Sequence, residues 1–100
     1  MSVVVSLTPA TARKLRLYVA GESPATLRAR VQCRAIAAAA GALEIEEVDV
    51  LTSPAVAEAY GILATPTLSD EAMAPPRRVV GDLSDIERIL QFLGIERATA

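Results

Sequence analysis

The chain has 100 residues and a formal net charge of -2, and 52% of its residues are apolar but only 3% are aromatic. This length predicts one domain, with a core built from Val, Ile, Leu and many alanines. The near-neutral charge and scarcity of rings argue against nucleic acid or an acidic membrane surface as a partner. No run approaches the roughly 20 apolar residues of a membrane span, and we expect a cytoplasmic protein.

The residue types also limit the chemistry. The chain has no histidine, which excludes a Ser-His-Asp triad, a Cys-His dyad and a His-ligated metal. Cys33 is the only cysteine, so neither an intrachain disulfide nor a Cys-x-x-Cys pair can form. We therefore expect no catalytic residue, no cofactor and no metal site.

The N-terminal part reads as a leader followed by a strand. Residues 1–13 mix small, polar and apolar types, and we expect a flexible leader in which Val3–Val5 could add a short edge pairing. Residues 14–20 alternate between apolar and polar side chains, which predicts a half-buried strand that ends at Gly21.

The next element is a predicted helix with two apolar faces. Ser23 is a suitable N-cap, Pro24 a suitable first residue, and Gly41 a stop after about Ala40. One face carries Leu27, Val31, Ala35 and Ala38; the nearly opposite face carries Ala29, Cys33, Ile36 and Ala40. We interpret this second face as a solvent face of strong helix formers, and the alternative is that it meets a partner protein.

A second strand is predicted over residues 42–51, where the apolar alternation changes parity. Leu43 and Ile45 share one parity, whereas Val48 and Val50 have the other. Two explanations remain open: a bulge near Glu46, or burial on both faces as in a central parallel strand. With the preceding strand and helix, this strand would form a right-handed βαβ unit.

A corner at Thr65-Pro66-Thr67 follows a short predicted helix over residues 54–60. Pro66 cannot donate to a ladder and biases Thr65 toward an extended conformation, so it belongs at the start of a strand. We expect that strand to reach residue 68 or 69. A loop over residues 70–76 and a last, antiparallel strand over residues 77–80 would follow.

The last predicted helix carries the clearest pattern. Ser84-x-x-Glu87 has the spacing of a capping box. An apolar stripe at helical spacing follows it, made of Ile86, Ile89, Leu90 and Leu93. Gly94 should end this helix, and residues 95–100 should form a frayed tail.

These elements give the order β-α-β-α-β-β-α in a single α/β domain over residues 14–94. This order is that of the thioredoxin-like architecture, in which a cis-proline corner precedes the third strand. Pro66 occupies that place, so Thr65, Pro66 and Thr67 are the predicted structural corner. The position of the reactive thiols in a thioredoxin reads Ala-Gly-Glu-Ser-Pro here, which disfavours redox catalysis. We expect Cys33, in mid-helix, to be a small packing residue.

Several blocks resemble the KaiB family of circadian clock proteins. The similarity runs over about residues 14–93, and its most specific parts are Ile-Leu-Ala-Thr-Pro-Thr-Leu at 62–68 and Gly-Asp-Leu-Ser at 81–84. Leu-Tyr-Val-Ala-Gly at 17–21, Asp-Val-Leu at 49–51 and the Arg-Arg-Val-Val strand at 77–80 add to it. Either of the first two blocks alone would be a weak signal.

The resemblance implies a non-enzymatic regulator that binds the N-terminal ATPase ring of a KaiC-type hexamer. KaiA and a sensor kinase are further partners in this family. The family also switches fold: the monomer that binds KaiC is thioredoxin-like, and a tetrameric ground state rearranges the C-terminal half. Because residues 84–93 read as a self-consistent capped helix, we predict that the thioredoxin-like form dominates here.

Six charged residues are candidates for partner binding: Arg28, Glu44, Glu46, Asp49, Arg77 and Arg78. The first four lie on or beside the first helix and second strand, which form much of the KaiC-facing surface in this family. The arginine pair at 77 and 78 could bind an acidic partner, and the alternative is that it only brackets a strand with one side chain in solvent. The acidic second strand departs from the family, in which a basic residue is common there, and such a reversal of charge favours a different partner. Two alternatives remain: a thioredoxin-like interaction or redox-sensing domain without a Cys-x-x-Cys pair, and a stress-response module.

Overall fold

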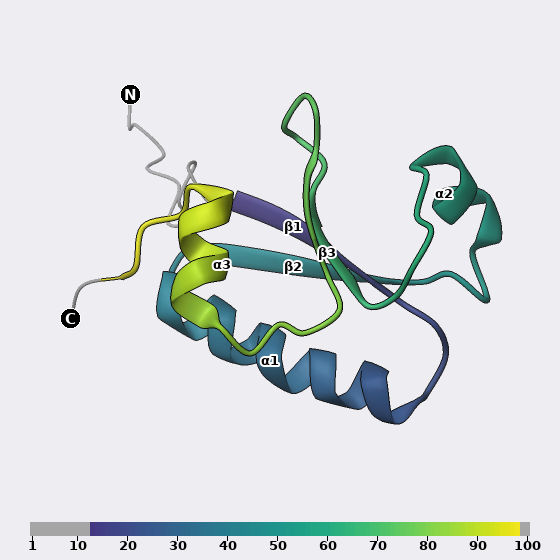
Figure 1. The fold of residues 1–100 in the computed structure, drawn as a ribbon, viewed down its shortest axis with the longest axis horizontal. Coiled ribbons are helices and arrows are strands. Elements are labelled where there is room, and N and C mark those ends of the chain that lie inside the picture. Colours follow the sequence, from purple (N-terminus) through teal and green to yellow (C-terminus); the bar gives the residue numbers. More distant parts are fainter. Residues whose placement is uncertain (1–12, 99–100) are drawn as a thin grey trace, which may run out of the picture.

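The computed structural model describes residues 13–98 and confirms the predicted order of elements (Figure 1). The suggested pairing of Val3–Val5 and most of the predicted leader lie outside these residues. The elements are β1 (Arg13–Val19), α1 (Pro24–Ala40), β2 (Leu43–Asp49), α2 (Pro54–Ala59), β3 (Thr67–Asp70), β4 (Arg77–Val80) and α3 (Ile86–Leu93). Arg13 is therefore the first residue of a strand and not part of the leader.

The four strands form one mixed sheet in the order β2-β1-β3-β4. β1 and β2 are parallel, whereas β3 is antiparallel to both β1 and β4. The parallel register runs without interruption from Arg13 opposite Leu43 to Val19 opposite Asp49, so there is no bulge at Glu46. The central-strand interpretation of β2 is also wrong. β2 is an edge strand, and its parity change reflects a charged residue, Glu47, on the helix side.

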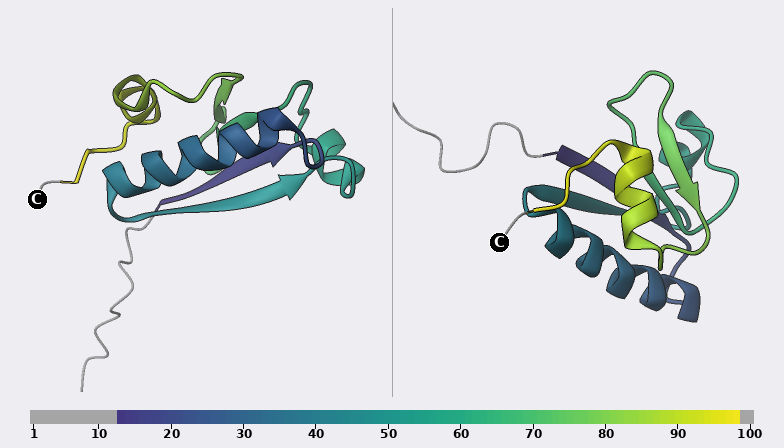
Figure 2. Two further views of the ribbon diagram at one scale, coloured as in Figure 1. Left: turned by 90° about the horizontal axis from the view of Figure 1, so that it is seen from below. Right: turned by 60° about the vertical axis from the view of Figure 1, so that its left-hand side comes forward.

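Helices α1 and α3 cover the same face of the sheet, as the left view of Figure 2 shows. The core lies between them and the sheet, and it joins the inward residues of β1 to Leu68, Leu83 and the buried residues of both helices. The short helix α2 lies beyond one end of the sheet in Figure 1. The opposite sheet face, here called the open face, carries no helix among residues 13–98.

Helix α1 uses the face that the sequence interpretation assigned to solvent or a partner. Ala29, Cys33 and Ile36 are buried against the sheet, whereas Leu27 and Val31 are exposed. Small residues let the helix approach the strands closely, which explains why alanines occupy the core side. The ends are as predicted: the Ser23 Oγ accepts the Thr26 N–H at 3.1 Å, and Gly41 follows the helix with a φ of 83°.

Helix α3 buries its apolar stripe as predicted, but its N-cap is one residue later than expected. The Asp85 carboxylate accepts the Arg88 N–H at 3.2 Å, and the helix begins at Ile86. Ser84 instead donates its hydroxyl to Asp82 at 2.9 Å, so the predicted capping box does not form. Either residue type can cap, and the preceding turn decides which one does.

The corner lies where the sequence predicts it, and β3 begins directly after it at Thr67. The Thr65–Pro66 peptide bond is cis, and the Thr67 hydroxyl donates to the Ala64 carbonyl at 2.7 Å. The expected frayed tail is held in two places: Ile95 packs against the core, and the Ala98 N–H donates to Ala39. An apolar side chain next to the core explains this difference.

Candidate partner-docking surface

The outward side of α1 exposes two large apolar side chains. Leu27 is 54% exposed and Val31 is 60% exposed. With the exposed alanines at 35 and 38 they form a continuous strip, here called the outer α1 face. Single exposed apolar residues are ordinary, but a row of them along a helix marks a surface suited to protein contact.

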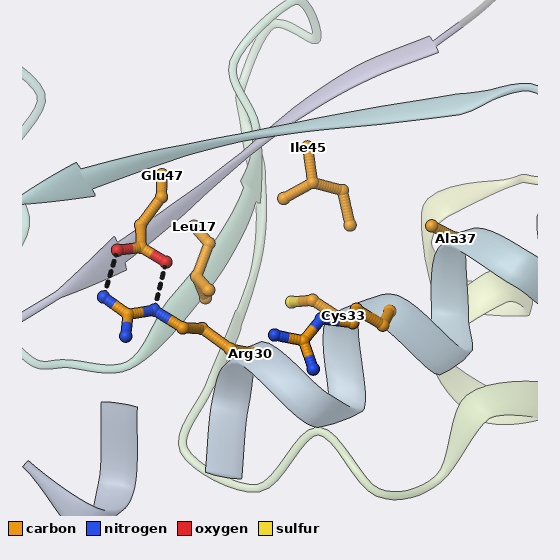
Figure 3. A pocket seen from close by; sticks show the side chains of 7 residues that line it. Leu17, Arg30, Cys33, Ala37, Ile45 and Glu47 are labelled. Atoms are coloured by element: carbon orange, nitrogen blue, oxygen red, sulfur yellow. Dashed lines mark hydrogen bonds and ion pairs between the residues drawn. The ribbon is translucent and has the colours of Figure 1, made fainter. Parts of the chain in front are cut away.

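Arg30 ties this helix to the neighbouring edge strand. Its guanidinium contacts both carboxylate oxygens of Glu47 on β2, at 2.8 and 2.7 Å, and both oxygens of Glu22 before the helix, at 2.8 and 2.6 Å. Hydrogen bonding to Arg30 lowers the pKa of Glu22 below its ordinary value. Figure 3 shows the Arg30–Glu47 pair at one end of a cavity between α1 and β2. The pair fixes how the helix and the edge strand sit together.

Cys33 lines the same cavity, and its surroundings oppose thiol chemistry. Its side chain lies among Leu17, Ala37 and Ile45 (Figure 3). Burial, with a smaller contribution from the Glu47 charge, raises the pKa of the thiol from 9.0 to about 11. Because the thiolate is the nucleophile, a protonated buried thiol is unreactive near neutral pH. The expected packing role of Cys33 is confirmed.

The open face carries a chain of polar contacts from β2 to β4. Arg16 contacts Glu46 at 3.2 Å and donates to the Tyr18 hydroxyl, which in turn donates to Glu71 at 2.8 Å. Glu71 also pairs with Arg78 at 2.9 Å. Tyr60 lies under the Arg16 guanidinium, 4.9 Å from its ring centroid. These contacts cover the buried Tyr18 ring in place of a helix.

Two of the predicted binding residues lie on this open face of β2. Glu44 and Glu46 are exposed, and only Glu46 is engaged, by Arg16. Asp49 does not face outward. Its carboxylate accepts the Gly21 and Leu51 N–H groups at 3.0 and 2.9 Å, which lowers its pKa and holds two loops together.

The other three predicted residues are dispersed. Arg28 is exposed on α1 beside the Pro66 corner, on the side of the helix away from β2. Arg77 donates to the Phe92 carbonyl at 2.9 Å, which ties β4 to α3. Arg78 is half-buried on the open face and paired with Glu71. The six residues therefore do not form one cluster.

Sequence reasoning missed the outer α1 face and the two arginine networks. The spacing of Leu27 and Val31 was visible, but apolar residues at that spacing usually mark a core. Arg16 and Glu46 also lie directly opposite each other in the parallel register, which no local pattern reveals. Within the described part of the chain no group of acidic or thiol side chains could hold a metal ion, and no helix is long and apolar enough to cross a membrane.

Comparison with solved structures defines the class of protein. The N-terminal domain of SasA from Synechococcus elongatus superposes with a TM-score of 0.67 at 20% identity and covers 100% of both chains. Chloroplastic thioredoxin z superposes with a TM-score of 0.61 at 20% identity and covers 87% of this chain and 84% of its own. The fold is therefore thioredoxin-like.

Comparison of sequences identifies the family. The KaiB domain model matches residues 16–95. The circadian clock oscillator protein KaiB of Parasynechococcus marenigrum is 44% identical over 86 residues, which cover 84% of this chain and 83% of that protein. The KaiB of Prochlorococcus marinus strain NATL2A is 47% identical over 78 residues, 76% of this chain and 73% of its own. The chain belongs to the KaiB family of clock proteins.

Proposed function

We propose that this protein is a regulatory adaptor that docks on the N-terminal ATPase ring of a KaiC-type protein. The observation that carries the proposal is the outer α1 face in a chain of the KaiB family, on a helix that the Arg30–Glu47 pair holds to the acidic edge strand β2. KaiA or a sensor kinase would be further partners, and the SasA domain shows that a similar fold occurs in another protein. A cytoplasmic location stays a prediction.

The exposed side chains suit such a contact. Large apolar groups at the centre of an interface contribute most of its binding energy, and Leu27 and Val31 are more than half exposed, so docking would bury apolar surface that the fold leaves open. Glu44 and Glu46 lie on the opposite, open face of the sheet, so a partner that reached them would have to extend around the β2 edge, where charges would mainly set partner choice and association rate. Their acidity would then favour a basic matching surface.

The test is a binding measurement with the KaiC homologue from the same source, in ATP and in ADP. Val31→Lys should weaken binding about tenfold or more, the effect of losing roughly 1.4 kcal/mol at a buried contact. Phe92→Lys is the matched control, because Phe92 is exposed on α3 and borders a pocket with residues of β4, not with the outer α1 face. If the unmodified protein does not bind in either nucleotide, or if the two variants bind equally well, the proposal fails.

The redox alternative gives the opposite result at Cys33. A thiol-dependent sensor would lose its function on Cys33→Ala, whereas a docking adaptor with a buried thiol would keep it. A stress-response module would share the fold but show no nucleotide-dependent binding to the ring. The same binding measurement therefore distinguishes a stress-response module from a docking adaptor.

The form in solution is part of this proposal. We infer that the thioredoxin-like monomer is the form that docks, and that a dimer or tetramer would accompany a switched fold. Measurement of the mass, together with the solution secondary structure of residues 60–95, tests this inference. Strand in residues 84–93 would contradict the predicted dominance of the form with helix α3.

A further inference from the structure

Strand β4 forms the edge of the sheet farthest from β2, and its outer side is unpaired. Among residues 13–98, β4 pairs only with β3. The Gly81 N–H donates to the Pro66 carbonyl at 2.9 Å, and alternate residues of an antiparallel strand face the same neighbour. Residues 77, 79 and 81 therefore direct their backbone groups toward β3, whereas Arg78 and Val80 direct theirs outward.

The two arginines of β4 do not guard this edge. Charged side chains commonly prevent a strand from pairing with an exposed edge. Here Arg77 donates to the Phe92 carbonyl at 2.9 Å, on the helix side of the sheet. Arg78 donates to Ser69 at 3.1 Å and pairs with Glu71 at 2.9 Å, on the open face. Both guanidiniums are therefore engaged within the fold, which leaves the outward backbone groups as the unpaired part of the edge.

A groove of about 640 Å³ lies between this edge and helix α3, which runs beside β4 in the right view of Figure 2. Val80 is 58% exposed and Phe92, on α3, is 47% exposed, and Val79 and Ile89 also line the groove. Because Val79 packs against the core, its neighbour Val80 projects to the open face. A strand added to β4 would therefore contact apolar surface on both of its faces.

The groove also holds a cation that the fold does not engage. Arg88 is exposed on α3, and its guanidinium has no ion pair within residues 13–98. The carboxylates of the groove are occupied: Asp85 accepts the Arg88 N–H at 3.2 Å, and Asp82 accepts the Ser84 N–H at 3.0 Å. A single carboxylate on an added strand would pair with Arg88, whereas a run of carboxylates would be repelled by Asp82 and Asp85.

We propose that the outer edge of β4 binds an extended peptide segment of a partner protein as an added strand, and that this segment carries one acidic side chain between apolar ones. The segment would bond to the outward backbone groups of Arg78 and Val80, pack its apolar side chains against Phe92 and place its carboxylate near Arg88. No residue of α1 or β2 lines this groove. The proposal therefore goes beyond docking on a KaiC-type ring and does not depend on it.

The test is the binding of a synthetic heptapeptide to the full chain, followed through the amide signals of the protein. The probe, acetyl-Thr-Leu-Thr-Glu-Thr-Leu-Thr-amide, when extended carries its leucines and its glutamate on one side and its threonines on the other. Its side-chain order is the same in both directions, so either direction of pairing is tested. At saturation the Arg78 and Val80 amides should exchange about tenfold more slowly or less, whereas the Val79 amide, which faces β3, should change little.

A charge exchange tests the contact with Arg88. Arg88→Glu should weaken binding of the probe about fivefold or more, and a probe with lysine in place of glutamate should bind this variant more tightly than it binds the unmodified protein. Arg34→Glu is the matched control, because Arg34 is an exposed arginine of α1 that lines the cavity between α1 and β2, and its substitution changes the net charge equally. This control should bind the original probe as the unmodified protein does.

Three outcomes would overturn the proposal. Absence of protection of the Arg78 and Val80 amides at probe concentrations up to about 1 mM would mean that the edge does not accept a strand. Equal weakening in Arg88→Glu and Arg34→Glu would mean that net charge alone attracts the probe. Protection of the two outward amides that rises with protein concentration, without the probe, would show that a second copy of the chain pairs with this edge.

Discussion

Helices α1 and α3 cover the same face of the sheet, yet their sequences indicate their packing with very different clarity. α3 has one apolar stripe, and that stripe is buried. α1 has two apolar faces, and the one with the larger side chains at 27 and 31 is exposed. The difference shows that close approach to a sheet, not side-chain size, decides which face of an alanine-rich helix becomes the core.

The most direct test of which α1 face is buried is to truncate one residue on each face. Ile36→Ala should lower the free energy of unfolding by roughly 2–5 kcal/mol, because it removes a fully buried side chain and leaves a cavity. Val31→Ala should change it by no more than about 0.5 kcal/mol, because that side chain is exposed. Urea unfolding of both variants gives the measurement. Equal losses would mean that both faces are buried in solution.

The pH dependence of stability gives a second test of burial on the core face of α1, through the thiol of Cys33. The pKa of its thiol is about 11 in the folded protein, above its ordinary value of 9.0, because burial disfavours the thiolate. The unfolded chain therefore loses this proton first, and stability from this group falls as pH rises from about 9 to 11. The loss amounts to at most about 2–3 kcal/mol.

The measurement is unfolding free energy against pH in the unmodified protein and in Cys33→Ala. The unmodified protein should lose more stability than the variant between pH 9 and 11, and the two curves should run parallel below that range. Every other ionisable group is the same in the two proteins, so the difference between the two curves reports the thiol. Parallel curves throughout would mean that the thiol is accessible to solvent.

Most of the fold could be predicted from local signals. Ser23-Pro24 and Gly41 mark the ends of α1, and the Thr65-Pro66-Thr67 corner marks the start of β3. The position of β2 at the sheet edge could not be predicted, because strand order depends on contacts far apart in sequence. For the same reason the Arg30 and Arg16 networks, which join residues 17 and 30 positions apart, were invisible.

The candidate site was predictable only in part. Glu44 and Glu46 are exposed as a binding strand requires, but Asp49 is occupied by two backbone amides and Arg78 by Glu71. A charged residue in a sequence gives no sign of whether its hydrogen bonds are already made within the fold. The outer α1 face was misassigned because its residues have the spacing of a core.

The N-terminus of α3 tests which residue caps the helix, because the observed N-cap, Asp85, is one residue later than the predicted one. Asp85→Ala should cost about 0.5–2 kcal/mol, because it leaves the Arg88 N–H without its cap. Ser84→Ala should cost less, because its hydroxyl bonds only to the exposed Asp82. Thermal unfolding of the two variants decides between the caps. A larger loss for Ser84→Ala would restore the capping box that the sequence predicts.

Substitution of Glu87 should have the smallest effect on the unfolding free energy, and it tests the other half of the predicted capping box. In a capping box its carboxylate would accept a backbone N–H at the start of α3, but in this fold it pairs with Arg97 at the surface. Both side chains of that pair are more than half exposed, and exposed pairs contribute little in water. Glu87→Ala should therefore change the unfolding free energy by less than about 0.5 kcal/mol, and added salt should reduce even that. Arg97→Ala should give the same small change, because both substitutions remove one contact. A clearly larger loss for Glu87→Ala than for Arg97→Ala would mean that Glu87 supports the helix end directly, as the sequence pattern alone indicates.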